Sequence, residues 1–121
     1  MLQEADLTFE IRSAVFEVHS VLGPGFLEKV YERALLEELR HRGMGAETQI
    51  PLAVRYKGVV VGDYFADIIV EGRVLIEVKA QERASPSWDA QVLHYLKTTG
   101  LRVGLLVNFG GASATVRRFV T

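Results

Sequence analysis

Glu77 and Lys79 carry charges within a short and strongly apolar segment, residues 73–79 (RVLIEVK). The density of branched aliphatic residues predicts a buried β-strand there. Side chains two residues apart share a face of a strand, so Glu77 and Lys79 point to the same side as Leu75. Burying an unpaired carboxylate or ammonium group costs several kcal/mol. In a central strand the pair therefore needs partners or a metal ion; the alternative is an ion pair at the end of an edge strand.

A further acid, Asp67, stands in the preceding apolar segment, residues 59–70, which also predicts a strand. The two strands would form a hairpin around residues 71–72. A two-residue turn would pair Asp67 with Ile76 and leave the aspartate on the wrong face of the sheet. A loop with an odd number of residues, or a β-bulge, would bring Asp67 beside Glu77. We therefore predict one of these two irregularities.

Two carboxylates that converge on one point repel each other, and each raises the pKa of the other unless a cation lies between them. A hard divalent ion such as Mg²⁺ or Mn²⁺ prefers oxygen ligands and keeps several of its waters. Lys79 beside that ion could orient or activate a metal-bound water, or stabilise the charge that grows on a phosphate. Asp67, Glu77 and Lys79 together therefore suit phosphodiester hydrolysis.

The whole chain, residues 1–121, predicts a single α/β domain (α+β, with a mixed sheet) in the order ααβββαββ. Apolar spacing predicts helices over residues 8–22, 27–42 and 86–99. Strands are predicted over residues 46–57, 59–70, 73–79, 102–108 and 115–120, the first three as an antiparallel meander. Ser85 followed by Pro86 is typical of a helix start, and Gly100 of a helix end.

Three further polar residues lie on the predicted helices. Glu28 falls on the apolar side of the second helix, although a glutamate in a first turn is also favoured by the helix dipole alone. Gln91 and Tyr95 are four residues apart and share a face of the third helix with Trp88. Without further evidence, this pattern is best interpreted as a helix face that packs against the sheet and happens to include the Gln91 amide.

The charge balance limits the partners of the chain. It carries 14 basic and 15 acidic residues, a net charge of −1, whereas nucleic-acid-binding proteins usually have a basic excess that contacts phosphates. Any such contact must come from the local clusters at residues 40–42, 55–57 or 117–118, each of which is also ordinary solvated surface.

The chain shows no sign of export or membrane insertion. Residues 1–10 are acidic and lack the basic-then-apolar order of a signal peptide. No apolar run approaches the roughly 18 residues that span a bilayer. The sequence has no cysteine, which excludes disulfides and thiolate metal sites and fits a reducing compartment. We expect a soluble, cytoplasmic protein without membrane partners.

The residues named above recur within a longer ordered set of motifs. Residues 25–31 (GFLEKVY) match the motif that names the GxxExxY proteins, a compact branch of the PD-(D/E)XK nuclease superfamily, which the chain resembles over nearly its whole length. The matching segments are residues 18–19 with 22–25, 56–58, 62–64 before Asp67, 77–80, Gln91 with 95–97, 104–110 and 117–118. A lone Asp…Glu-x-Lys pattern occurs often by chance, but the ordered set is specific.

The resemblance implies a restriction-endonuclease-like core of the order αβββαβ. Asp67 and Glu77 would bind the catalytic Mg²⁺ or Mn²⁺ with help from the Val78 carbonyl, and Lys79 would position the attacking water.

The helical residues gain roles from the same resemblance. Glu28 is similar to the additional helical acid that completes the metal site in nuclease branches. Gln91 and Tyr95 look like the Gln-x-x-x-Tyr element that some exonuclease-like branches place beside the scissile phosphate. His19 and Tyr31 could support either the site or only the fold.

We therefore expect a Mg²⁺- or Mn²⁺-dependent nuclease that acts on DNA, with RNA as the less favoured substrate. The alternatives are a non-catalytic module that binds nucleic acid or protein, and a hydrolase of another phosphate-containing substrate. A pure binding module has no reason to hold buried carboxylates together, which favours the enzyme. A domain of 121 residues offers limited surface for a substrate, so a homodimer is an alternative to a monomer.

Overall fold

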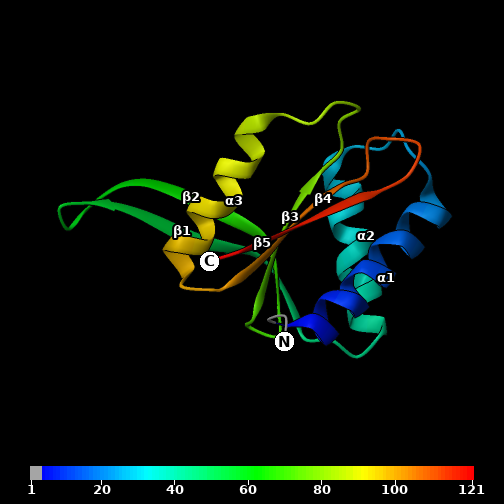
Figure 1. Cartoon of the computed structure of the whole chain (residues 1–121), viewed down its shortest axis with the longest axis horizontal. Helices are drawn as coiled ribbons and strands as arrows, with labels where there is room; N and C mark the ends of the chain where they lie inside the picture. The colour runs from blue at the N-terminus through cyan, green and yellow to red at the C-terminus, as the bar shows by residue number, and fades with distance from the viewer. Residues whose placement is uncertain (1–3) are drawn as a thin grey trace.

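The computed structural model describes residues 4–121, which form three helices and five strands (Figure 1). In chain order these are α1 (Ala5–Leu22), α2 (Glu28–His41), β1 (Ala46–Tyr56), β2 (Val59–Val70), β3 (Val74–Lys79), α3 (Pro86–Thr99), β4 (Val103–Asn108) and β5 (Thr115–Val120). The predicted order ααβββαββ is confirmed. Within the described part of the chain, no helix is long and apolar enough to cross a membrane.

The five strands form one mixed sheet in the order β1-β2-β3-β4-β5. The first three strands are an antiparallel meander, as predicted, and β4 pairs antiparallel with β5. β3 and β4 are parallel. A parallel pair needs a crossover connection, and α3 supplies it. Figure 1 shows α1 and α2 together beside one end of the sheet, with α3 apart from them.

The two faces of β3 bury their side chains in different cores. Val74, Ile76 and Val78 pack in the cluster that includes the apolar residues of α1 and α2. Leu75 packs in the cluster that includes the apolar residues of α3. By the alternation of a strand, Glu77 and Lys79 point toward the α3 side. β3 is the central strand of the sheet. The alternative that Glu77 and Lys79 form an ion pair at the end of an edge strand is therefore wrong.

Local signals explain where α3 begins and ends. The hydroxyl oxygen of Ser85 accepts a hydrogen bond from the Ser87 amide at 3.3 Å, and Pro86 is the first helical residue. Gly100 ends the helix with φ 76°, a left-handed conformation that glycine adopts without strain. These signals fix where α3 starts along the chain, and hence which of its residues face the sheet.

Candidate functional site

The loop between β2 and β3 has the odd number of residues that we predicted. Val70 pairs with Val74, so residues 71–73 form a three-residue loop. The ladder continues through Ile69 with Leu75 and ends at Ile68 with Ile76. The next step of the same register places Asp67 opposite Glu77, on one face of the sheet.

Beyond the end of this ladder, the two carboxylates accept hydrogen bonds from the backbone of the opposite strand. The Asp67 amide donates to Glu77 Oε1 at 3.2 Å, and the Val78 amide donates to Asp67 Oδ2 at 2.8 Å. A main-chain amide within a sheet has a fixed direction. Each carboxylate is therefore oriented by the strand that carries the other.

Burial of this pair changes its protonation. Glu77 is 2% exposed, and burial raises its pKa to about 9. The charge of Asp67 also raises this pKa, whereas the hydrogen bond from the Asp67 amide and the charge of Lys79 lower it. Burial also raises the pKa of Asp67, to about 6, opposed by the Val78 amide. Without a metal ion between them, burial and mutual repulsion both favour a protonated form of the pair.

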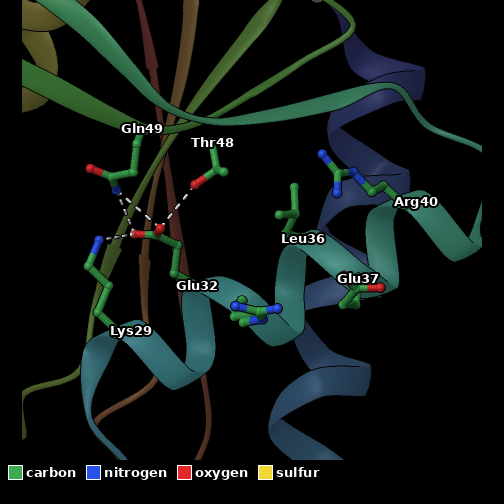
Figure 2. A pocket seen from close by; sticks show the side chains of 8 residues that line it. Lys29, Glu32, Leu36, Glu37, Arg40, Thr48 and Gln49 are labelled. Carbon is green, nitrogen blue, oxygen red and sulfur yellow. Dashed lines mark hydrogen bonds and ion pairs between the residues drawn. The ribbon is translucent and has the colours of Figure 1, made fainter.

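On the α2 side, Figure 2 shows a hydrogen-bonded network built on Glu32. This network adjoins Asp67 through Gln49. Glu32 is 6% exposed and accepts hydrogen bonds from the Thr48 hydroxyl at 3.0 Å and from Gln49 Nε2 at 3.1 Å to each of its oxygens. Lys29 Nζ lies 3.5 Å from Glu32 Oε1. Gln49 Nε2 is also 3.5 Å from Asp67 Oδ1, so this amide bridges the helix carboxylate and the strand carboxylate.

Sequence reasoning identified one of the two acids that α2 directs toward Asp67. The charges of Glu32 and Glu28 both raise the pKa of Asp67, and Glu32 has the larger effect. Glu28 is half-buried at the start of α2, whereas Glu32 makes the hydrogen bonds. Residues four apart share a helix face, so the spacing from Glu28 was a signal for Glu32 that we did not use.

The backbone at Gln49 explains how two neighbouring residues of β1 reach the same carboxylate. Adjacent side chains of a strand normally point to opposite faces. Gln49 has φ 52°, which is uncommon for a residue other than glycine, and the ladder with β2 is interrupted between Thr48 and Ile50. This left-handed residue turns Thr48 and Gln49 toward Glu32 together.

On the α3 side, Lys79 and two polar residues of α3 face the carboxylates. Lys79 Nζ lies 5.7 Å from the centre of the Trp88 ring, and its charge lowers the pKa of Glu77. Gln91 Nε2 donates to Tyr95 Oη at 3.0 Å. Burial raises the pKa of Tyr95, and the charges of the two strand carboxylates act in the same direction. Tyr95 is therefore within electrostatic reach of the pair.

A cleft of about 610 Å³ opens beside Lys79, between α3 and the hairpin of β1 and β2. Its lining comes from both walls and comprises Val54, Tyr64, Lys79, Ser87, Trp88, Ala90, Gln91, His94 and Tyr95. A second pocket, of about 400 Å³, lies between α2 and β1, around Glu32 (Figure 2).

The comparison with known families agrees with this arrangement. The family model described as the PD-(D/E)XK nuclease superfamily matches residues 5–119. The chain belongs to the PD-(D/E)XK nuclease superfamily. Among solved structures, the crystal structure of SSO0001 has a similar fold, with a TM-score of 0.59 and 18% identity over 77% of this chain. The chain spans 50% of the length of that solved chain. No curated protein matched the chain.

Nucleases of the PD-(D/E)XK superfamily generally use divalent metals, and the oxygen atoms around Asp67 and Glu77 suit such an ion. The Lys79 carbonyl accepts a hydrogen bond from the Phe109 amide, on the β4 side. Backbone groups alternate along a strand, so the Val78 carbonyl faces β2, as the Val78 amide does. Among residues 4–121, no three acidic or histidine side chains form a ready-made metal cluster. The donors therefore fit a site with two carboxylates, a carbonyl and waters.

Tyr31 and His19 both make hydrogen bonds to backbone carbonyl groups of loops. Tyr31 Oη donates to the Gly23 carbonyl at 2.5 Å, and its ring stacks on Phe109 at 4.6 Å between centres. His19 Nε2 lies 3.0 Å from the Gly111 carbonyl oxygen. Both side chains tie loops to the core, and the Tyr31 contact holds the turn that precedes Glu28. Through these contacts, His19 and Tyr31 stabilise the fold.

Proposed function

We propose that this chain is a divalent-metal-dependent nuclease that hydrolyses phosphodiester bonds of DNA. The pairing of Asp67 with Glu77 carries the proposal. Burial and mutual repulsion both make the ionised forms of these two carboxylates unfavourable. A cation bound between the two groups would offset both costs. The fold itself needs no such pair in the centre of a sheet, since apolar side chains would pack there at lower cost.

In this proposal, Asp67, Glu77 and the Val78 carbonyl would hold Mg²⁺ or Mn²⁺, and Glu28, whose charge acts on Asp67 from α2, would be an additional acid outside this ligand set. The bound ion would polarise a phosphoryl oxygen and lower the pKa of water. Gln49 would act as a positioning residue, because its amide contacts Asp67 Oδ1 and the anchored Glu32 carboxylate at once.

The residues on the α3 side would handle the substrate. The Lys79 ammonium group, close enough to lower the pKa of Glu77, orients the attacking water and offsets the charge that grows on the phosphate. The Tyr95 hydroxyl accepts the Gln91 hydrogen bond, so its own proton remains to donate to a phosphate oxygen. The raised pKa of Tyr95 keeps that proton in place at physiological pH.

The experiment is an assay of the purified chain on a mixture of DNA fragments with Mg²⁺ or Mn²⁺, with EDTA as the control that stops the reaction. Lys79→Ala should abolish cutting yet retain folding and metal binding. Asp67→Asn should weaken Mn²⁺ binding measured by calorimetry. If the wild type and Lys79→Ala are equally inert on DNA and RNA but still bind either, the non-catalytic binding module is the correct function.

A further inference from the structure

The cleft beside Lys79 has aromatic walls. Tyr64 comes from β2, while Trp88 and Tyr95 come from α3. Tyr64 and Tyr95 lie 6.0 Å apart between ring centres. Trp88 and Tyr95 are buried at 6% and 4% exposure, but Tyr64 is 49% exposed, so one ring is free to receive a stacked group.

The charges in this cleft differ from those of the chain as a whole. The chain has more acidic than basic residues, yet none of the described residues lining the cleft is acidic, and Lys79 and His94 are among them. The cleft also adjoins the strand carboxylates through Lys79. It therefore suits a ligand that combines an aromatic ring with an anionic group.

The rest of the surface is poorly equipped to bind duplex DNA. A protein that neutralises a duplex footprint makes about 6–10 phosphate contacts with lysine and arginine. Two of the arginines in the basic clusters are instead paired with acids: Arg42 Nε lies 2.7 Å from Glu38 Oε2, and Arg117 Nη1 lies 2.8 Å from Asp89 Oδ1. Their charges are offset within the protein.

The walls of the cleft are also set apart by the sheet itself. β2 pairs with β3 only from Ile68 to Val70, so the distal part of the β1–β2 hairpin continues as a two-stranded arm (Figure 1). Tyr64 and Val54 stand on this arm and face α3 across the cleft. The volume of about 610 Å³ is in the range of small-molecule pockets, about 300–1,000 Å³, which accommodates a nucleotide but not a duplex.

We infer that the cleft binds single-stranded DNA, with one base stacked on Tyr64 and the adjoining phosphate at Lys79. The inference rests on the proposed nuclease function and specifies its substrate. Stacking on aromatic side chains accepts any base and does not need a broad basic surface. It therefore accounts for how a chain with a net charge of −1 can hold nucleic acid.

The chain contains a natural reporter for this test, because Trp88 is its only tryptophan and lies in the cleft. The whole chain is titrated in EDTA with a single strand of about 12 nucleotides and with the matching duplex. The single strand should quench Trp88 fluorescence and bind about tenfold tighter than the duplex. Its log affinity should fall with log salt at a slope of about −0.7, since a single phosphate contact to a single strand contributes about that much. Tighter binding of the duplex, or a slope steeper than about −4, would overturn the inference.

A pair of tyrosines on one hairpin supplies matched variants. Tyr64→Ala should weaken single-strand binding about tenfold, and Tyr64→Phe should keep it, because stacking needs the ring. Tyr56 is 62% exposed near the tip of the same hairpin and is not among the cleft residues, so Tyr56→Ala should bind like wild type. Thermal unfolding checks that both alanine variants are folded. Equal affinity of Tyr64→Ala and wild type would overturn the inference.

Further outcomes of the binding and cleavage experiments distinguish a failure of this inference from a failure of the proposed function. An RNA strand of the same sequence that binds more tightly than the DNA strand would overturn the choice of DNA. A chain that binds single strands through Tyr64 in EDTA but cuts nothing with Mg²⁺ would refute the nuclease and support the cleft. A chain that cuts single strands and duplexes equally, whatever residue replaces Tyr64, would support the nuclease and refute the cleft.

Discussion

The two sides of the strand carboxylate pair are built in contrasting ways. On the α2 side, Glu32 is buried and accepts hydrogen bonds from two residues of β1, besides an ion pair with Lys29 (Figure 2). On the α3 side, Lys79 borders an open cleft with aromatic walls. One side holds the carboxylates in place, and the other opens into a cleft that Lys79 lines.

This contrast shows how a small domain can combine rigidity with access. A reactive constellation needs supporting groups that fix its geometry, and those groups must not fill the space that a substrate occupies. Here the sheet separates the two tasks. Gln49 bridges Glu32 and Asp67 from the supporting side, whereas Gln91 and Tyr95 face the substrate side. The contrast predicts different consequences for substitutions on the two sides.

The largest effect is expected at the pair itself. Glu77→Gln keeps the shape of the side chain but removes a proposed metal ligand, so DNA cleavage should fall by about 10³-fold or more. The metal-free variant should be more stable than wild type by about 1–3 kcal/mol, because a neutral amide replaces a carboxyl group that is costly to ionise in this buried place. Cleavage assays and urea unfolding in EDTA measure the two quantities. A variant that is less stable and equally active would show that Glu77 is a structural residue.

The pH dependence of stability should follow from the same pair. A carboxyl group whose pKa is raised on folding binds its proton more tightly in the folded state, so it contributes most below its ordinary pKa of 4.5. That contribution is lost as the pH rises toward the folded pKa of about 9 for Glu77. In EDTA, wild type should therefore lose about 1–3 kcal/mol relative to Glu77→Gln between about pH 5 and pH 9.

Mn²⁺ provides the control for this pH profile. A cation bound by the ionised pair replaces the shared proton, so saturating Mn²⁺ should abolish the decline in wild type and leave Glu77→Gln nearly unchanged. The measurement is a series of urea unfolding curves at each pH, with and without the ion. Parallel profiles of wild type and variant in EDTA would mean that the pair does not hold a proton in the folded state.

On the supporting side, the expected effect is on stability. Glu32→Ala removes the acceptor of the Thr48 and Gln49 hydrogen bonds and should lower the free energy of unfolding by about 1–3 kcal/mol. Lys29→Ala is the matched control: it removes only an ion pair whose lysine is 72% exposed, which is worth about 0–1 kcal/mol. Urea unfolding compares the two. Equal losses would show that the network around Glu32 does not stabilise the protein.

Strand periodicity made the central part of this site predictable. The alternation of β3 put Glu77 and Lys79 on one face, and the parity of the hairpin then required an odd loop if Asp67 was to join them. Both arguments depend only on local geometry. The Gln-x-x-x-Tyr spacing of Gln91 and Tyr95 on α3 is equally local, since residues four apart share a helix face.

The supporting network was not predictable in the same way. It depends on the left-handed backbone of Gln49, and nothing in the surrounding sequence distinguishes that residue from an ordinary strand residue. It also depends on how α2 packs beside β1, which brings Glu32 within reach of Thr48. Contacts between distant elements are set by packing, so the sequence pattern alone offered Glu32 only as a neighbour of Glu28 on the helix.

The smallest effect, and the sharpest test of the contrast, is expected at Gln49. Gln49→Ala removes the amide that links Glu32 to Asp67 Oδ1 and should weaken Mn²⁺ binding about tenfold, as loss of a group supporting a metal ligand does. Calorimetric titration measures the affinity, and single-strand binding in EDTA should be unchanged because the residue lies away from the cleft.

Gln49→Gly serves as the control for the backbone, because it removes the same amide but accepts φ 52° without strain. The two variants should therefore bind Mn²⁺ alike, and the glycine variant should be the more stable of the two. If both bind Mn²⁺ like wild type, Gln49 holds the strand in shape and does not position Asp67, and the two sides of the site are less distinct than their hydrogen bonds suggest.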